Sequence, residues 1–448
     1  MRNKIRKQLR IVEPSIDHEH AKELEQILVL ISEHPEIAAL VYENLIRGLD
    51  DPGAGRDGMM TAEQVFNVLL IKQMNGFSYA SLRFHLADSR TYRWFCGFGI
   101  ADKIPSEKTL NRDIKKIHPE TLEKINRIFL GAATDEGIEK GRKVRVDCTV
   151  TESNIHHPTD SSLLWDSVRV LCRETQKATN KFRVKVSDHR RRAKKRAMGV
   201  LNARNKKIRI KHYRDLLNVT KKVVTDAERV RDSLLKKGGT NITAMSICAK
   251  LSYFIPLAQR VIDQTERRVL GGEKLKPEDK LVSIFEPHTD IIVKDRRETY
   301  YGHKLAITGG ASGLLTDLVI EEGNPADATL AEKMIVRQKD IYGRVPRQAA
   351  FDGGFASKPN LASIKEFGVK DVMFSKKRGL KVSDMTKSAW VYKRLRDFRA
   401  GIEGMISFLK RSLGLTRCTW RGLKSFKAYA WSSVVTANLL LMARRMLA

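Results

Sequence analysis

The sequence predicts an α/β protein in which a mixed-sheet core follows an all-helical N-terminal region and is interrupted by a large helical insertion. Apolar residues recur at helical spacing through about residue 140, as in AKELEQILVLISEHPEIAALVYENLI. Alternation typical of strands begins only at GRKVRVDCTV and returns after residue 281. The 448 residues, 42% of them hydrophobic, suffice for two or three domains with their own cores.

These changes of pattern divide the chain into five segments. We expect a helical N-terminal region at 1–140, a core formed by 141–160 and 281–425, a basic helical insertion at 161–280, and a closing helix at 426–448. The closing segment is apolar but contains Thr436 and Asn438, which favours a core helix over a membrane span.

Two stretches of the N-terminal region predict short helices joined by tight turns. MNGFSYASLRFHLADS predicts a helix that ends at Asn75-Gly76 and another that begins near Ser78. IPSEKTLNRDIKKIHPETLEKI opens with Pro105 and an N-cap-like Ser106 before a basic helix. A helix-turn-helix module that binds DNA has this pattern, although plain helical bundles have it too.

Two aspartates are expected at strand ends. Val144, Val146 and Cys148 alternate with polar residues, so Asp147 lies at or near the end of the first strand. The stretches LVSIF, YYGHKLAITG and LLTDLVIEEG predict further strands, followed by a helix over 327–341. RQAAFDGGF then predicts a buried strand that ends at Asp352, before two glycines that allow a sharp turn and close approach to a ligand. A helix over 359–367 and the strand KDVMFS complete this part.

The charge balance indicates a polyanionic partner. The chain has 83 Lys and Arg against 52 Asp and Glu, a formal charge of +31, and nucleic acid is the first candidate to neutralise it. No apolar stretch long enough to span a membrane and no signal-peptide core is present, so we expect a cytoplasmic, nucleoid-associated protein without a membrane partner. The five cysteines include no CxxC pair, which argues against a disulfide framework and a zinc ribbon.

The most basic segment lies inside the predicted insertion. Fifteen Lys or Arg residues stand between Lys181 and Arg214, where Asp188 is the single acid. A solvated charged helix is the ordinary interpretation, but so many unneutralised cations repel one another, which favours contact with a phosphate backbone. We therefore expect Lys194, Lys195 and Arg196 to bind DNA.

A lone carboxylate stands in the basic and apolar stretch FRAGIEGMISFLKRSLG. Ile402, Leu409 and their apolar neighbours form one helix face, and Arg399, Glu403 and Lys410 fall on the stripe beside it. An ordinary ion pair four residues apart is one interpretation. The other is a site: a mixed sheet that pairs the strand of Asp147 with the strand that ends at Asp352 would bring the two aspartates together, and the packed helix would add Glu403.

Three carboxylates this close repel one another unless divalent cations lie between them. Carboxylate oxygens are the ligands that Mg²⁺ or Mn²⁺ prefers, and two such ions activate a water or a 3′-hydroxyl on one side of a phosphodiester and stabilise the leaving oxygen on the other. Asp147, Asp352 and Glu403 are thus the candidate catalytic and metal-binding residues. Arg399 and Lys410 are then candidate phosphate contacts beside the metals.

These motifs resemble the DDE-type insertion-sequence transposases, whose C-terminal signature is Y-x2-R-x3-E-x6-K. Arg399, Glu403 and Lys410 fit its last three positions, whereas position 396 is Arg and Tyr392 lies one turn earlier. VDCTVTESN and AFDGGF resemble the segments that carry the first and second aspartates, and GHKLAIT and EEGNPADATL resemble the segments between them. The resemblance covers about 141–425.

The resemblance implies an RNase H-like catalytic core with a two-metal centre. It also implies that transposon terminal repeats are cut, that the 3′-hydroxyl is joined to target double-stranded DNA without a covalent protein–DNA intermediate, and that a homodimer brings two ends together. Two other functions stay open: a metal-dependent structure-specific nuclease on the same fold, and a non-catalytic DNA-binding protein.

Other polar residues compete for places in the site. Asp317 is expected mid-strand, and Asp327 at a helix start, where an N-cap role is the ordinary explanation. Glu152 is a candidate to support the metal ligands. His156 and His303 are candidate contacts to DNA or metal, although each is more often a structural histidine.

Overall fold

The computed structural model describes residues 3–5, 16–49, 59–182, 184, 186–237, 241–294 and 298–448. Within it the chain forms two compact units, the first built from Met1–Glu152 with His303–Ala448 and the second from Ser153–Gly302. The boundaries of the five predicted segments remain predictions.

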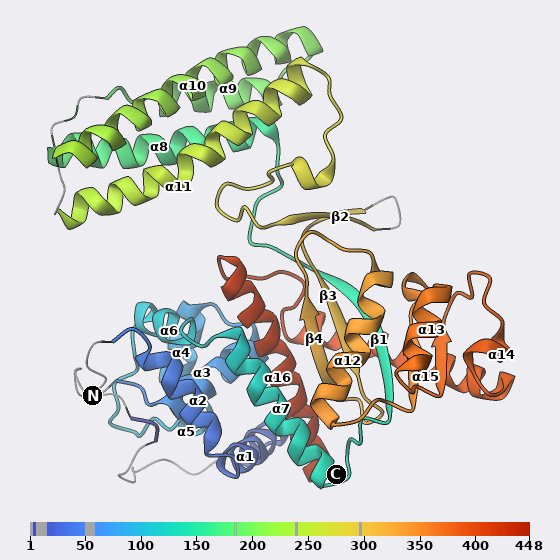
Figure 1. Cartoon of the computed structure of the whole chain (residues 1–448). Helices are drawn as coiled ribbons and strands as arrows, with labels where there is room; N and C mark the ends of the chain where they lie inside the picture. The colour runs from blue at the N-terminus through green and yellow to red at the C-terminus, as the bar shows by residue number, and fades with distance from the viewer. Residues whose placement is uncertain are drawn as a thin grey trace. The chain divides into compact units, whose positions relative to one another are not determined.

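The N-terminal part of the first unit is helical, as expected (Figure 1). Gly76, at φ 61°, ends one helix and Ser78 caps the next, so the predicted break is confirmed. The Ser106 side chain likewise accepts from the Thr109 N–H and caps its helix. The helices are α1 (Glu19–Ser32), α2 (Glu36–Ile46), α3 (Ala62–Asn75), α4 (Tyr79–Asp88), α5 (Arg90–Phe95), α6 (Glu107–Ile114) and α7 (Pro119–Asp135).

A mixed sheet forms the core, which confirms the predicted α/β class. Its strand order is β2-β3-β1-β5-β6, and β4 also pairs with β3. The β1–β5 and β5–β6 pairs are parallel, whereas β3 pairs antiparallel with β2 and β4. The strands are β1 (Lys143–Glu152), β2 (Asp290–Lys294), β3 (Glu298–Gly309), β4 (Leu315–Ile320), β5 (Gln348–Phe351) and β6 (Asp371–Phe374).

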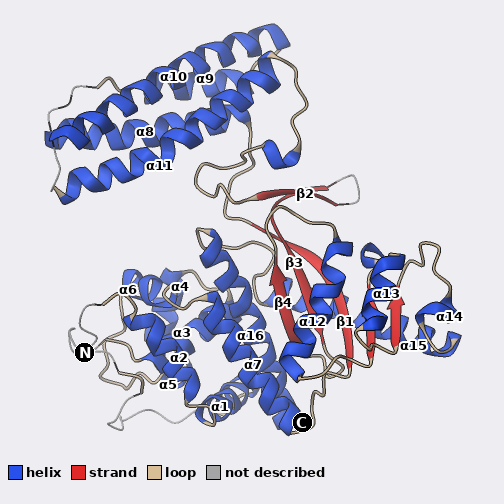
Figure 2. Cartoon of the chain, viewed as in Figure 1, coloured by secondary structure: helices blue, strands red, loops and turns tan. Residues whose placement is uncertain are grey.

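Helices cover both faces of this sheet (Figure 2). Alternate residues of β1 and β5 bury one face against α12 and α13, and Ala350 and Met373 bury the other against α15. The long helix α16 packs against α7, α1 and α3. The helical segments of this part are η3 (Asp327–Leu330), α12 (Ala331–Tyr342), η4 (Gly353–Phe355), α13 (Lys358–Glu366), α14 (Val382–Met385), α15 (Ala389–Ser412) and α16 (Leu423–Leu447).

The closing helix α16 is a core helix, as its polar residues predicted. Asn438 is fully buried; its amide oxygen accepts from the Leu315 N–H, and its nitrogen donates to the Leu315 carbonyl and to Asn126. Buried polar groups need such partners, and here they tie α16 to both β4 and α7. In the part of the chain that the structure describes, no helix is long and apolar enough to cross a membrane.

The second unit confirms the predicted helical insertion. Its four long helices enclose their own apolar core. The predicted strand LVSIF is wrong: residues 281–285 form no strand, because Leu281 and Ile284 are buried against the helices instead of pairing with another strand. The helical segments are α8 (Asp160–Phe182), α9 (Arg190–Leu201), α10 (Lys206–Lys237), α11 (Ile242–Thr265), η1 (Glu266–Leu270) and η2 (Pro277–Asp279).

Candidate active site

The parallel pairing of β1 with β5 brings the two aspartates together. Val146 lies opposite Phe351 in the register, so Asp147 and Asp352 are the next residues on neighbouring strands. Asp352 directly follows β5, as predicted. Asp147 lies inside β1 and not at its end, because β1 continues to Glu152, whose N–H donates to the Thr416 carbonyl after α15. Asp147 therefore lies at the point where β1 continues beyond the end of its partner β5.

The helix α15 reaches this point because it packs very closely on β1. Gly401 leaves room for the Arg145 guanidinium, which a Cβ at this position would strike. Arg145 donates to the Phe398 carbonyl at 3.0 Å and lies over the Phe398 ring, and Lys143 lies 4.1 Å from the same ring centre. These contacts fix how closely α15 approaches β1 near Arg399 and Glu403.

One guanidinium joins all three carboxylates. Arg399 Nη2 lies 2.7 Å from Asp147 Oδ2 and 3.0 Å from Asp352 Oδ1, and its Nη1 lies 2.9 Å from Glu403 Oε1. The Arg399 and Asp147 side chains are each 15% exposed, whereas Glu403 is 66% exposed. The i,i+4 ion pair is thus real, and it is also one part of a larger acidic cluster.

The carboxylate of Asp352 is held ionised. Burial alone would raise its pKa, but hydrogen bonds from the Gly353 N–H and the Ser375 hydroxyl, together with the Arg399 charge, lower the pKa below its ordinary value. The Ser375 bond is 2.9 Å long. Sequence reasoning missed Ser375, although it follows β6 as Asp352 follows β5, and parallel neighbours end at one edge.

The glycines after Asp352 act by close approach and not through a left-handed turn. The chain turns here in the 3₁₀ helix η4, as expected, but neither Gly353 nor Gly354 has a positive φ. A Cβ on Gly354 would lie 2.5 Å from Asp327 Oδ2, and a Cβ on Gly353 would lie 2.6 Å from Lys376 Cγ. On the side of Gly353 and Gly354, protein atoms therefore fill the space around Asp352.

Two family models match the chain. Residues 12–116 match the Transposase domain (DUF772), and residues 259–439 match the Transposase DDE domain. The chain belongs to the DDE transposases. The α/β fold with its mixed sheet is accordingly the RNase H-like fold of that family, together with an N-terminal helical domain. No curated protein and no solved structure matches the chain.

The matched ranges include only part of the acidic cluster. Asp352, Arg399, Glu403 and Lys410 of the transposase lie inside the DDE match, whereas Asp147 lies outside both matches. The role of Asp147 therefore depends on the geometry, which places it beside Asp352.

The family implies dependence on a divalent metal. Within the described residues, no three His, Cys, Asp or Glu side chains are gathered as a metal site, because Arg399 lies between the three acids. The donor set nevertheless fits: oxygens of Asp147 and Asp352 face one nitrogen atom, and Mg²⁺ is usually held by one or two carboxylates with water and phosphate oxygens. The guanidinium supplies here the positive charge that a metal would supply.

The signature helix of the transposase differs from the family pattern at one position. Arg396 is exposed and faces its neighbour Asp397. The Tyr392 hydroxyl donates to the Phe374 carbonyl at the end of β6, so this tyrosine anchors α15 to the strand that precedes Ser375. Lys410 is half-buried on α15, two turns beyond Glu403.

The competing acids lie outside the cluster. Asp317 is mid-strand in β4, as predicted, and is bonded to Arg337 at 2.5 Å. Asp327 is not the N-cap of η3, which is Ala326; its carboxylate pairs with Lys304 instead. The N-cap explanation is therefore wrong, because the nearby lysine competes successfully for the carboxylate.

The remaining candidates have structural contacts. His303 is fully buried against the Phe426 ring, and His156 faces Asp166 within the second unit. Glu152 ends β1, where its carbonyl accepts from the Cys418 N–H. A supporting role for Glu152 at the metal ligands remains a prediction.

The three basic residues singled out in α9 differ in their surroundings. Lys194 and Lys195 are exposed. Arg196 is half-buried and, together with Arg192, binds Asp215 of α10. The two lysines are thus available to a phosphate backbone, whereas Arg196 holds two helices of the bundle together.

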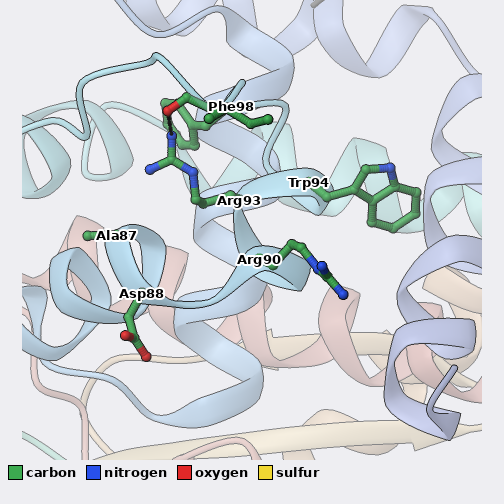
Figure 3. Close-up of a pocket in the computed structure, with 7 residues that line it drawn as sticks. Ala87, Asp88, Arg90, Arg93, Trp94 and Phe98 are labelled. Carbon is green, nitrogen blue, oxygen red and sulfur yellow. Dashed lines mark hydrogen bonds between the residues drawn. The ribbon is translucent and has the colours of Figure 1, made fainter. Parts of the chain in front are cut away.

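A separate hollow of about 280 Å³ opens in the N-terminal helices, lined by Asp88, Arg90, Arg93, Trp94, Phe98 and Ile100 among others (Figure 3). The Arg93 guanidinium turns to the loop after α5 and donates to the Gly99, Ile100 and Asp102 carbonyls. Its charge therefore stabilises the loop. The DNA-binding role predicted for this region stays a prediction.

Proposed function

We propose that the chain is an insertion-sequence transposase that binds the ends of its element, cleaves them and joins the exposed 3′-hydroxyl to target DNA by two-metal-ion phosphodiester transfer. The convergence of Asp147, Asp352 and Glu403 on one guanidinium carries this proposal. A DNA-binding protein without catalysis has no need to gather acids from three distant segments at a sheet edge.

The three carboxylates would together hold two divalent ions, either Mg²⁺ or Mn²⁺. When bound, the ions activate the attacking oxygen and stabilise the leaving one. Arg399 and Lys410 contact phosphate oxygens of the DNA beside them, Arg399 with a planar fork that suits a phosphate. Ser375 and the Gly353 N–H keep Asp352 ionised, so it is ready as a ligand at neutral pH.

Binding of double-stranded DNA involves other surfaces. Lys194 and Lys195, with Arg196 behind them, contact the backbone of the terminal repeats, and the short helices α3, α4 and α6 act as a helix-turn-helix module. Two ends are cut together by a homodimer. The chain works in the cytoplasm, where it reaches the chromosome.

The test is incubation of the chain with DNA of its flanking genomic locus and Mg²⁺, with nicks and joined products mapped to the nucleotide. We expect nicks at the element's ends with wild type, and none with Asp147→Asn, Asp352→Asn or Glu403→Gln, each of which still binds the ends. The matched control is Asp340→Asn, an exposed acid of α12.

Other outcomes separate the alternative functions. Cleavage without joined products would indicate a structure-specific nuclease. Binding without any Mg²⁺-dependent nick would indicate a non-catalytic DNA-binding protein. Retained cleavage in one of the three variants would remove that residue from the site.

A further inference from the structure

A second charged pair lies behind the acidic cluster, on the face of the sheet that packs against α12. Lys304 of β3 donates to Asp327 Oδ1 at 2.8 Å and to the Pro325 carbonyl at 2.6 Å. Both side chains are largely buried, at 14% and 26% exposure. The lysine thus fixes the Asp327 carboxylate in one place.

The Lys304–Asp327 pair links the strand beside β1 to the segment after β5. Lys304 lies on β3, which is next to β1, the strand of Asp147, in the sheet. Gly354, two residues after Asp352, lies so close that a Cβ would be 2.5 Å from Asp327 Oδ2. The pair therefore joins β3, the neighbour of β1, to the segment after β5.

An amide clamp holds η3 to η4. The Asn360 side-chain nitrogen donates to the Ala328 carbonyl in η3 at 2.7 Å and to the Phe355 carbonyl in η4 at 2.8 Å. Two independent contacts therefore fix η3 relative to η4. One is the close approach of Asp327 to Gly354, and the other is the pair of hydrogen bonds from Asn360.

We propose that Asp327, held by Lys304, is a positioning residue that sets the separation between the Asp147 and Asp352 carboxylates for a divalent cation. The inference rests on the proposed function of the site and adds residues that are not ligands. Asp327 is not a ligand itself, because its carboxylate is bonded to Lys304 and lies on the opposite face from Arg399.

The physical reason is the narrow geometry that such a cation accepts. Mg²⁺ requires oxygens at about 2.0–2.1 Å in a near-octahedral arrangement, so a small shift of one carboxylate relative to the other lowers affinity. Groups that orient metal ligands without touching the metal typically change affinity by about 10–100-fold. Without the pair, only the β1–β5 pairing and the amide clamp between η3 and η4 would hold the segment after β5 in place.

The experiment is a calorimetric titration of the full chain with Mn²⁺, together with urea unfolding in metal-free buffer. We expect Asp327→Ala and Lys304→Met each to weaken Mn²⁺ binding by about 10-fold or more. The double variant should be no weaker than the worse single variant, because the two residues act as one unit. Gly354→Ala should give the same loss, since its Cβ pushes the segment away from Asp327.

The matched control is Glu321→Gln, which removes an ion pair with Lys333 elsewhere on this unit. It should leave the Mn²⁺ affinity unchanged. If Asp327→Ala and Lys304→Met lower only the unfolding free energy and keep the wild-type Mn²⁺ affinity, the pair is merely structural and the inference is overturned. Should Asp327→Ala fail to fold, Gly354→Ala and Lys304→Met decide by the same criterion.

The inference and the proposed function fail in different ways. If wild type and Asp147→Asn titrate alike, the acids do not bind the metal and the proposed function is wrong. If Asp147→Asn loses Mn²⁺ binding while Asp327→Ala, Lys304→Met and Gly354→Ala retain it, only the positioning role is wrong.

Discussion

The Nη2 atom of Arg399 lies 2.7 Å from Oδ2 of Asp147 and within hydrogen-bonding distance of Asp352 as well. In the absence of metal, this cation neutralises two acids that would otherwise repel each other. Arg399→Gln should therefore lower the unfolding free energy in metal-free buffer by about 1.5–3 kcal/mol, the usual range for hydrogen bonds to charged groups. Saturating Mg²⁺ should recover much of the loss, since metal binding stabilises the folded state.

Urea unfolding with and without Mg²⁺ measures both effects. Arg396→Gln, an exposed arginine one turn earlier on the same helix, is the control and should change neither value. An Arg399→Gln chain as stable as wild type without metal would show that the guanidinium does not compensate the acids.

The depressed pKa of Asp352 makes its stabilising effect depend on pH. Because the folded-state pKa lies below the ordinary value of 3.8, ionised Asp352 stabilises the fold above that value, and the effect disappears as pH falls through the folded pKa. The difference in unfolding free energy between wild type and Asp352→Asn should be constant from pH 7 to about pH 5 and shrink below pH 3.8. Urea melts along this range in metal-free buffer test it; a difference that grows on acidification would contradict it.

The hydroxyl of Ser375 helps to hold Asp352 in place. Ser375→Ala should raise the pKa of Asp352 and reduce Mg²⁺-dependent nicking by about 10-fold, the low end for loss of a group that orients a metal ligand. Ser363→Ala removes a similar 2.8 Å bond, to Glu332 on α12, and should nick like wild type. Equal rates for the two variants would remove Ser375 from the site.

Replacement of two glycines of α15 by alanine should have opposite effects on stability. Gly401→Ala places a Cβ against Arg145, which is held by the Phe398 carbonyl and ring, so it should destabilise the chain by about 1–3 kcal/mol and displace Glu403. Gly404→Ala meets nothing within 4 Å and should stabilise the helix by up to about 1 kcal/mol. Thermal unfolding and nicking assays compare them; nicking by Gly401→Ala at the wild-type rate would contradict the close packing.

The basic residues of α9 should differ in whether their loss affects DNA binding or the stability of the fold. Lys194→Ala with Lys195→Ala should flatten the salt dependence of end binding by about 0.9 logarithmic units for each phosphate that the chain no longer neutralises, and should leave stability unchanged. Arg196→Ala should instead lower the unfolding free energy, because it breaks the ion pair with Asp215. Lys222→Ala, an exposed lysine of α10, controls for the loss of charge alone. An unchanged salt slope would assign the two lysines to another surface.

Sequence patterns predicted those features that local chemistry decides. The break at Gly76, the cap at Ser106 and the stripe of Arg399 and Glu403 on α15 follow from propensity and helical spacing, and the structure has all three. The pairing of β1 with β5 is expected because it would bring two strand-end aspartates together, and no local pattern alone predicts it.

The misses share one cause, which is that partners distant in sequence were decisive. Asp147 is inside its strand because β1 also pairs with β3 and ends in a bridge to the segment after α15. Residues 281–285 are as apolar as a buried strand, yet Leu281 and Ile284 are buried by helices. Asp327 looks like a cap until Lys304 is brought beside it by the sheet. None of these interactions has a signature in the local sequence.

The position of Glu403 in α15 has a consequence for synthesis of the chain. The bundle and the N-terminal helices precede it, so a growing polypeptide presents its basic surfaces before the third acid exists. A product that stops ahead of α15 would lack Glu403, and it would also lack α16, which packs against α1, α3 and α7. The third acid and the N-terminal core are thus completed by the same C-terminal stretch, so a shortened chain would lose both together.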